Sequence, residues 1–179
     1  MKPKRILLKL SGETLLGSHE SGIDFSILGN LADQVLAVKK AGYEVAVVLG
    51  AGNIWRFRDT KNSGIDRVSS DYMGMLATIM NSVALMSAIE HRGGVVRVCS
   101  AIDVPAMAES YINRRANRHM EKGRIVICAG GTGNPYFTTD SASALRALEL
   151  ECDLLVKATN VDGVFDSDPN KNKRAKLYK

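Results

Sequence analysis

The sequence alternates short apolar runs with longer amphipathic stretches, and this alternation constrains the fold more than any other feature. Arg5–Leu10 (RILLKL) and Glu44–Leu49 (EVAVVL) are mainly apolar, as are parallel strands buried on both faces. Between them, apolar residues recur at helical spacing on one stripe: Ile27, Leu28, Leu31, Val35 and Val38. Because strands that alternate with amphipathic helices are typical of α/β proteins, we expect an α/β fold.

The same reasoning places the remaining elements. Further strands are predicted at residues 95–99, 124–129 and 153–158. Helices are predicted over residues 24–42, 71–90 and 105–121 and from residue 140 onward. Residues 160–168, which contain an Asp-Gly pair, predict a hairpin or turn-rich segment.

Caps and stripes support these helices. Asp24 is the expected N-cap of the first helix, and Gly42 suits its C-terminal end. Asp71 and Asp140 head the second and fourth predicted helices, so each has a possible role as an N-cap. In the second helix, we expect a Met-rich stripe to face the core: Met73, Leu76, Met80 and Val83.

Length and charge point to one globular domain. The chain has 179 residues and a formal charge of +5, but residues 171–179 supply five of its 24 Lys and Arg residues and no acid. The other 19 basic residues match the 19 acidic ones, so we expect no nucleic-acid partner. No apolar run approaches the ~20 residues of a membrane helix, and Lys9 interrupts the apolar run near the N-terminus. We therefore expect a cytoplasmic protein without a membrane partner.

Cysteine and histidine do not indicate a metal site. Cys99, Cys128 and Cys152 lie far apart, and their odd number does not suit a disulfide framework. The three histidines are equally scattered, with no second ligand at helical spacing. We expect buried, reduced thiols and no metal held by the protein.

Glycine-rich turns follow three of the predicted strands. Ser11 and Gly12 follow the first strand, GAGN (50–53) follows the second, and GGTGN (130–134) follows the strand that ends at Ala129. Ligands of open α/β sheets bind beyond the carboxyl ends of the strands, and glycine lets backbone N–H groups approach phosphate oxygens. Neither GxxxxGK[ST] nor GxGxxG is present, so the chain binds phosphate with other turns.

Charged residues flank these turns. Lys9 precedes the first turn and could neutralise a phosphoryl group in transfer. Arg56 follows the second turn and could grip a phosphate with two N–H groups. Together with the glycines, these residues predict a phosphate-binding edge of the sheet.

These segments resemble the bacterial UMP kinases of the amino-acid-kinase superfamily. The matching segments are KRILLKLSGE (4–13), GID (22–24), VVLGAGNIWR (47–56), DYMGMLATIMN (71–81), GTGNPYFTTDSA (131–142) and KATNVDGVFDSDP (157–169). The resemblance implies a three-layer α/β/α sandwich around a mainly parallel sheet. It also implies phosphoryl transfer from ATP to UMP in pyrimidine nucleotide biosynthesis, with Mg²⁺ accompanying ATP. The resemblance further implies a homo-oligomer, typically a hexamer in the family, with GTP as an activator and UTP as an inhibitor.

The resemblance also assigns residues by role. Lys9 and Asp140 would be catalytic. UMP would contact Ala51, Asp71, Thr132, Gly133, Asn134, Pro135, Tyr136, Phe137, Thr138 and Thr139. ATP would contact Lys9, Leu10, Ser11, Gly12, Gly52, Arg56, Thr159, Phe165 and Asp168.

The chain departs from the family in two respects. Where the family turn reads GGGN, Ala51 takes the place of the second glycine, which would weaken phosphate binding if the position needs a positive φ. Family chains also continue beyond the position of Tyr178, so we expect a single domain over residues 1–179 with an incomplete ATP-side lobe.

Two alternatives remain open at this stage. A related amino-acid kinase would phosphorylate a carboxylate or carbamate, although the GTGNPYFTTD segment disfavours it. A catalytically impaired fragment would bind UMP without turnover.

Overall fold

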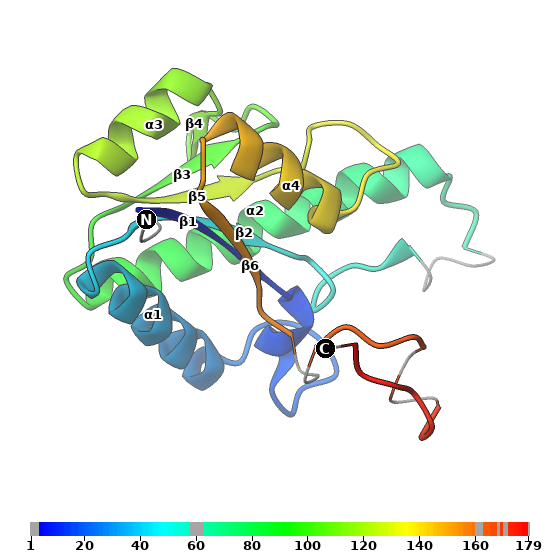
Figure 1. The fold of residues 1–179 in the computed structure, drawn as a ribbon. Coiled ribbons are helices and arrows are strands. Elements are labelled where there is room, and N and C mark those ends of the chain that lie inside the picture. Colours follow the sequence, from blue (N-terminus) through cyan, green and yellow to red (C-terminus); the bar gives the residue numbers. More distant parts are fainter. Residues whose placement is uncertain (1–3, 58–62, 160–162, 168, 170–171, 179) are drawn as a thin grey trace.

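One six-stranded sheet organises the chain, with helices on both faces (Figure 1). The computed structural model describes residues 4–57, 63–159, 163–167, 169 and 172–178. The strands are β1 (Arg5–Leu10), β2 (Glu44–Leu49), β3 (Val96–Ser100), β4 (Glu109–Ser110), β5 (Ile125–Ala129) and β6 (Leu154–Lys157). The helices are α1 (Phe25–Lys40), α2 (Arg67–His91), α3 (Asn113–Glu121) and α4 (Thr139–Glu149), with a 3-10 turn, η1 (Gly12–Leu16).

Every strand pair in the sheet is parallel, in the order β4-β3-β5-β2-β1-β6. The carboxyl ends of these strands therefore share one edge, which brings the glycine-rich turns together. The predicted mainly parallel α/β sandwich is confirmed.

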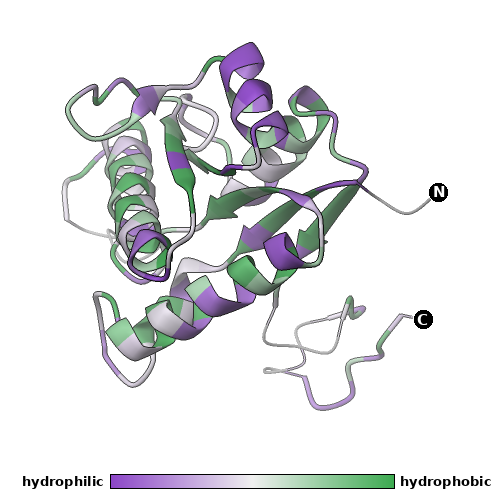
Figure 2. Cartoon of the chain, turned by 90° about the vertical axis from the view of Figure 1, so that its left-hand side faces the viewer, coloured by the Kyte–Doolittle hydropathy of each residue, from purple (hydrophilic) through white to green (hydrophobic). Residues whose placement is uncertain are grey.

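Two hydrophobic cores lie on opposite faces of the sheet. Alternate residues of β2 divide between them, since Val45 and Val47 pack against α1 and α2, whereas Ala46 and Val48 pack on the side of α3 and α4. Figure 2 shows the strands as mainly apolar and the helices as mixed in hydropathy. A fully buried Val, Leu or Ile contributes about 1.5–3 kcal/mol, so these cores supply the main driving force for folding.

The first predicted helix is confirmed together with its cap. The Asp24 carboxylate accepts the backbone N–H groups of Ser26 at 2.9 Å and Ile27 at 3.2 Å. The hydrogen bond from the Ser26 side chain is the largest cause that lowers the pKa of Asp24 below its ordinary value. Gly42 follows the helix with a φ of 97°, a conformation that favours glycine.

The prediction for α2 was wrong in its start and in its buried face. The helix begins at Arg67, because the Asp66 carboxylate accepts the Ser69 N–H at 3.0 Å and caps it, so Asp71 is not an N-cap. Of the predicted stripe, Met73, Leu76 and Met80 are 38%, 48% and 56% exposed, whereas Val83 packs against the core as expected. The buried face instead combines apolar residues, among them Ile79, Leu85 and Ile89, with four polar ones: Ser70, Thr78, Asn81 and Ser82. Hydrogen bonds satisfy these polar groups, so their burial carries little penalty.

The boundaries of five further elements differ from the prediction. Residues 105–112 form a turn and the short strand β4 rather than a helix, and α3 begins only at Asn113. Thr138 caps α4 by accepting the Ser141 N–H at 3.1 Å, so Asp140 lies in the first turn and is not the cap. Strand β3 is shifted by one residue, and β5 and β6 are shorter than predicted. The predicted hairpin at 160–168 lies partly outside the described residues, and Phe165 there pairs with Leu177 in an antiparallel bridge.

Helix α2 is long and apolar enough to cross a membrane, but 44% of its apolar 18-residue stretch is buried inside the protein. A core helix of a soluble protein can have the same length and composition. Cys99 and Cys128 are buried and Cys152 is partly buried, and all three are free thiols. Burial raises the pKa of the Cys99 thiol to about 11, so the thiol is protonated at neutral pH.

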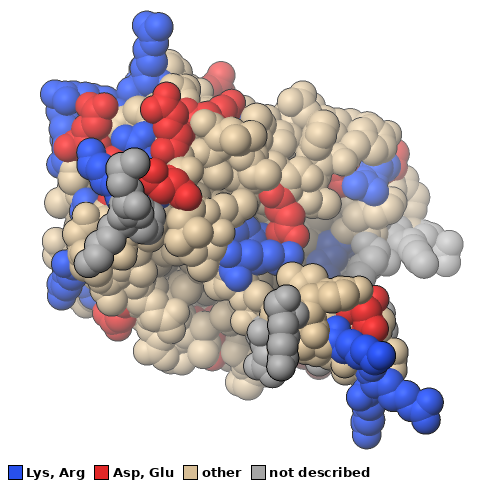
Figure 3. All heavy atoms as spheres, in the orientation of Figure 1, with Lys and Arg blue, Asp and Glu red and all other residues tan. Residues whose placement is uncertain are grey.

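Charges are interspersed over α3. On the face seen in Figure 3, Lys and Arg side chains above α3 alternate with acidic ones, and further basic side chains gather at the C-terminal segment. Arg118 lies 3.0 Å from Glu121, and Arg115 lies 3.8 Å from Glu109. Two arginines of this polar helix therefore form ion pairs with nearby glutamates.

Candidate functional site

Two lysines and one aspartate meet at the carboxyl edge of the sheet. The Lys9 ammonium lies 2.8 Å from Oδ1 of Asp140, and the Lys157 ammonium lies 2.7 Å from Oδ2. Lys9 and Lys157 are register partners on β1 and β6, while Asp140 comes from the first turn of α4. We call Lys9, Asp140 and Lys157 the lysine cluster.

The environment keeps Asp140 ionised. Burial by itself would raise the pKa of this carboxyl, but hydrogen bonds and charges from Lys157 and Lys9 outweigh it and lower the pKa below 3.8. The N-terminal end of α4 also favours a negative charge. With two ammonium groups and one carboxylate, the cluster carries a net positive charge, which suits a phosphoryl group.

Lys157 was missed in the sequence-based site. It lies one residue before the end of the last predicted strand, just as Lys9 lies one residue before the end of the first. The signal was therefore present, but only the order of strands in the sheet shows that the two lysines are neighbours.

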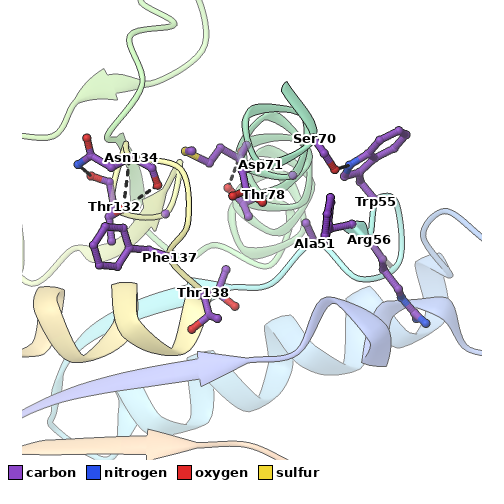
Figure 4. A pocket seen from close by; sticks show the side chains of 15 residues that line it. Ala51, Trp55, Arg56, Ser70, Asp71, Thr78, Thr132, Asn134, Phe137 and Thr138 are labelled. Atoms are coloured by element: carbon purple, nitrogen blue, oxygen red, sulfur yellow. Dashed lines mark hydrogen bonds between the residues drawn. The ribbon is translucent and has the colours of Figure 1, made fainter. Parts of the chain in front are cut away.

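A cavity of about 390 Å³, here called the aromatic cavity, opens at the same edge of the sheet (Figure 4). Its walls come from the turn after β2, the first turns of α2 and the segment after β5. Its lining combines rings with hydroxyl, amide and carboxylate groups: Ala51, Trp55, Arg56, Phe57, Ser70, Asp71, Gly74, Met75, Thr78, Gly131, Thr132, Asn134, Phe137, Thr138 and Thr139. A planar ring with polar edges would fit such a lining.

A second cavity of about 570 Å³, here called the polar cavity, shares Arg56 with the aromatic cavity. It is lined by Lys9, Ser11, Glu13, Thr14, Leu16, Gly17, His19, Arg56, Lys157, Ala158 and Thr159. Arg56 lines both cavities, and in Figure 4 its side chain extends away from Asp71 and Phe137. The two cavities therefore adjoin, and both lysines of the cluster line the polar one.

Close packing fixes the first two glycine-rich turns against each other. A Cβ atom on Gly12 would lie 2.4 Å from the carbonyl oxygen of Gly50, so only glycine fits there. The Asn81 side chain donates to that same carbonyl at 2.8 Å and pairs with Asn53. Ala51 does not have a positive φ, and its methyl group lines the aromatic cavity, so the backbone tolerates alanine without strain.

Hydrogen bonds to side chains of α2 hold the segment after β5 in place. The Thr78 hydroxyl accepts the Gly130 N–H at 2.9 Å, and the Asp71 carboxylate accepts the Tyr136 N–H at 2.7 Å. Gly130, Gly131 and Gly133 all have φ between 60° and 82°. The glycines therefore allow a sharp turn that bends over the aromatic cavity.

Most of the sequence-predicted site residues come together. Seven of the ten proposed UMP contacts line the aromatic cavity: Ala51, Asp71, Thr132, Asn134, Phe137, Thr138 and Thr139. Gly133, Pro135 and Tyr136 lie in the same segment without lining the cavity. Trp55, Phe57 and Thr78 also line it and were missed, because their role depends on how two loops and a helix meet.

The proposed ATP contacts do not all line one cavity. Lys9, Ser11, Arg56 and Thr159 line the polar cavity, and Leu10 lines a smaller cavity of about 210 Å³ beside it. Gly12 and Gly52 belong to the packed turns. Phe165 lies in the bridge with Leu177, and Asp168 lies outside the described residues.

Within the described part of the chain, no three His, Cys, Asp or Glu side chains come close enough to hold a metal ion. Asp140 is engaged by two lysines. The described residues therefore do not form a metal cage of their own.

The chain is similar to known kinases in sequence and in structure. The sequence model of the amino acid kinase family matches residues 4–179. The uridylate kinases of Zymomonas mobilis and Methylococcus capsulatus are each 55% identical, over 97% and 98% of this chain and 72% and 73% of their own lengths. The UMP kinase structure from Bacillus anthracis has a TM-score of 0.93 at 42% identity, over 99% of this chain and 74% of that one. The uridylate kinase structure from Archaeoglobus fulgidus has a TM-score of 0.71 at 28% identity, over 97% of this chain and 72% of that one.

Proposed function

The chain belongs to the amino acid kinase family, and on that premise we propose that it transfers a phosphoryl group from ATP to UMP, giving UDP and ADP. The observation that carries the proposal is the lysine cluster, whose two lysines line the polar cavity, which adjoins the aromatic cavity at Arg56. The uridylate kinase relatives and UMP kinase structures support UMP as the acceptor.

We assign the acceptor to the aromatic cavity. Its rings suit a uracil base, and the hydroxyl and amide groups of Thr132 and Asn134 suit the polar edge of that base. Asp71 offers a carboxylate that can accept hydrogen bonds from ribose hydroxyl groups. Arg56, which lines both cavities, would hold phosphate oxygens where they meet.

We assign the ATP phosphates to the polar cavity. The backbone after β1, at Ser11 and Gly12, approaches this edge without bulky side chains, and Lys9 and Lys157 supply positive charge. Lys9 would stabilise the negative charge on the transferred group. Asp140 would act as the positioning group that keeps both ammonium groups at the reacting edge.

The reaction needs no base to create the nucleophile. The acceptor phosphate is already an anion, with a second pKa of ~6. The protein therefore has to align two polyanions and balance their charge, which Lys9, Lys157 and Arg56 are placed to do.

Magnesium fits this scheme as part of the donor substrate. The described residues form no metal cage, and Mg²⁺ commonly reaches such sites bound to phosphate oxygens while keeping several of its waters. When bound, it supplies positive charge to the ATP phosphates.

We extend the proposal to a hexameric assembly, to GTP and UTP as effectors and to a cytoplasmic location. An apolar hollow of about 510 Å³ that includes Ile23, Phe25, Ile54 and Met80 supports a contact with another copy of the chain. Light scattering of the purified chain, with and without GTP or UTP, measures the oligomeric state directly.

An acceptor panel tests the proposal. The purified chain is mixed with ATP and Mg²⁺ and, in turn, with UMP, CMP or a carboxylate acceptor, and nucleotide products are separated by chromatography. UDP formed only with UMP supports the proposal. Phosphorylation of the carboxylate would favour a related amino-acid kinase, and UMP binding without UDP would favour an impaired catalyst.

A further inference from the structure

Arg67, the first residue of α2, makes contacts that none of the roles above uses. Its Nε lies 2.7 Å from Oδ2 of Asp71, one helical turn further along. The Asp71 side chain is 13% exposed, whereas that of Arg67 is 39% exposed. The arginine therefore covers the carboxylate from the solvent side.

The same guanidinium group lies against two aromatic rings. Its Cζ is 4.4 Å from the centroid of the Phe57 ring and 5.5 Å from that of the Tyr136 ring, both within cation–π range. Phe57 follows the turn after β2, and Tyr136 belongs to the segment after β5. One side chain thus connects the three walls of the aromatic cavity.

Tyr136 has a backbone conformation that needs such support. Its φ is 71°, in the left-handed region that residues with a side chain rarely adopt. Its N–H donates to Oδ2 of Asp71 at 2.7 Å, the oxygen that also faces Arg67. Among the described residues no donor pairs with Oδ1, so the carboxylate is held by one oxygen and can accept a ligand with the other.

We propose that Arg67 is a positioning residue of the acceptor site, which orients the Asp71 carboxylate and holds the Tyr136 turn over the aromatic cavity. This inference rests on the proposed function for the identity of the acceptor, UMP. Arg67 does not line the aromatic cavity itself, so it acts through Asp71, Tyr136 and Phe57.

A positioning role predicts an effect on acceptor binding that exceeds the effect on stability. A partly exposed ion pair contributes little to the free energy of unfolding. Loss of the flat guanidinium would leave the Asp71 carboxylate and the strained turn free to reorient, which lowers the affinity for a ligand that needs both in place.

The first test measures the amide hydrogen exchange of Tyr136 without any ligand, in the wild type, Arg67→Met and Arg67→Lys. Arg92→Met is the matched control, since Arg92 also joins α2 to an aspartate through Nε, at 2.8 Å from Asp33, away from the cavity. Faster exchange in Arg67→Met but not in Arg92→Met is expected. Unchanged exchange in Arg67→Met would overturn the inference, whatever the acceptor proves to be.

The second test uses Trp55, the single tryptophan of the chain, which lines the aromatic cavity. Titration of its fluorescence with UMP measures binding without turnover. Arg67→Met should raise the dissociation constant for UMP about tenfold, or about 1.4 kcal/mol. Arg67→Lys keeps the charge but not the flat face, so it should restore part of the affinity.

Steady-state kinetics complete the second test. The KM for UMP should rise in Arg67→Met while the KM for ATP and kcat change less than about twofold. A fall in kcat as large as the rise in the KM for UMP would contradict a positioning role. An equal rise in KM for UMP and for ATP would contradict it too. If the wild type binds no UMP, the proposed acceptor is wrong, and the exchange measurement still decides the role of Arg67.

Discussion

At the scale of single residues, the reacting edge depends on one carboxylate shared by two ammonium groups. Lys9 is 9% exposed although it carries a charge, and its partner Asp140 offsets the cost of that burial. Lys157 reaches the same carboxylate from the neighbouring strand and is far more exposed. The buried lysine is thus held in one position, which is what a group that stabilises a transferring phosphoryl group requires.

Replacing Lys9 separates its role in transfer from any role in acceptor binding. We expect Lys9→Met to lower kcat on the order of a hundredfold or more, because it removes charge stabilisation in the transition state. The affinity for UMP, measured by Trp55 fluorescence, should change little. Lys40→Met, at an exposed site on α1, is the control and should leave both values unchanged. A loss of UMP affinity as large as the loss of kcat would argue against this role for Lys9.

Asp140 should make stability depend on pH. Its folded-state pKa is lowered, chiefly by Lys157 and Lys9 against the opposing effect of burial, so its stabilising contribution is present above the unfolded value of about 3.8 and is lost as pH falls through the folded value. The melting temperature of Asp140→Asn should therefore lie below that of the wild type at pH 7, and the gap should narrow below pH 4. Asp33→Asn, which removes the carboxylate of an exposed pair with Arg92, should show a smaller gap at pH 7. A gap that stays constant from pH 7 to pH 3 would contradict the account.

At the scale of elements, the strands could be predicted more closely than the helices. β1 and β2 begin and end where their apolar runs do, because both faces of a central parallel strand are buried and the pattern is unambiguous. α2 carries two possible apolar stripes, and the sequence favoured Met73, Leu76 and Met80, which the structure leaves exposed. The buried face includes Thr78, Asn81 and Ser82, whose partners lie far away in the chain or one turn earlier in the helix, so composition could not identify it.

The glycine-rich turns after β1 and β2 were predicted to bind phosphate. The structure shows that Gly12 is also needed for packing, because the turn after β2 lies too close for a side chain. Gly12→Ala would place a methyl group 2.4 Å from the Gly50 carbonyl oxygen. We expect a loss of about 1–3 kcal/mol in the free energy of unfolding, since backbone must move. Urea denaturation measures this value.

Gly74→Ala is the matched control, because space for the added methyl group is present at this glycine. Gly74 lies inside α2, and the nearest atom to its Cβ would be a Trp55 side-chain carbon at 3.8 Å, an ordinary contact. Alanine there should stabilise by about 0.5–1 kcal/mol, because glycine in a helix interior is unfavourable. If Gly12→Ala proved as harmless as Gly74→Ala, the close approach of the two turns would be disproved.

At the scale of the whole molecule, the sheet brings distant segments to one edge. The sequence and its resemblance predicted the family, the fold and seven residues that line the aromatic cavity. They did not predict Lys157 or Trp55, because strand order and loop packing depend on contacts between segments far apart in the chain. The site is therefore a property of the assembled sheet edge, and single motifs supply only parts of it.

The proposed function places phosphoryl transfer at the lysine cluster, between UMP in the aromatic cavity and ATP in the polar cavity. The most direct measurement is phosphorus NMR of the purified chain with UMP, ATP and Mg²⁺, which follows UMP, UDP, ATP and ADP in one sample. UDP and ADP should appear in equal amounts with the wild type and at a strongly reduced rate with Lys9→Met. ATP consumed without UDP, or no reaction although UMP changes Trp55 fluorescence, would contradict the proposed function.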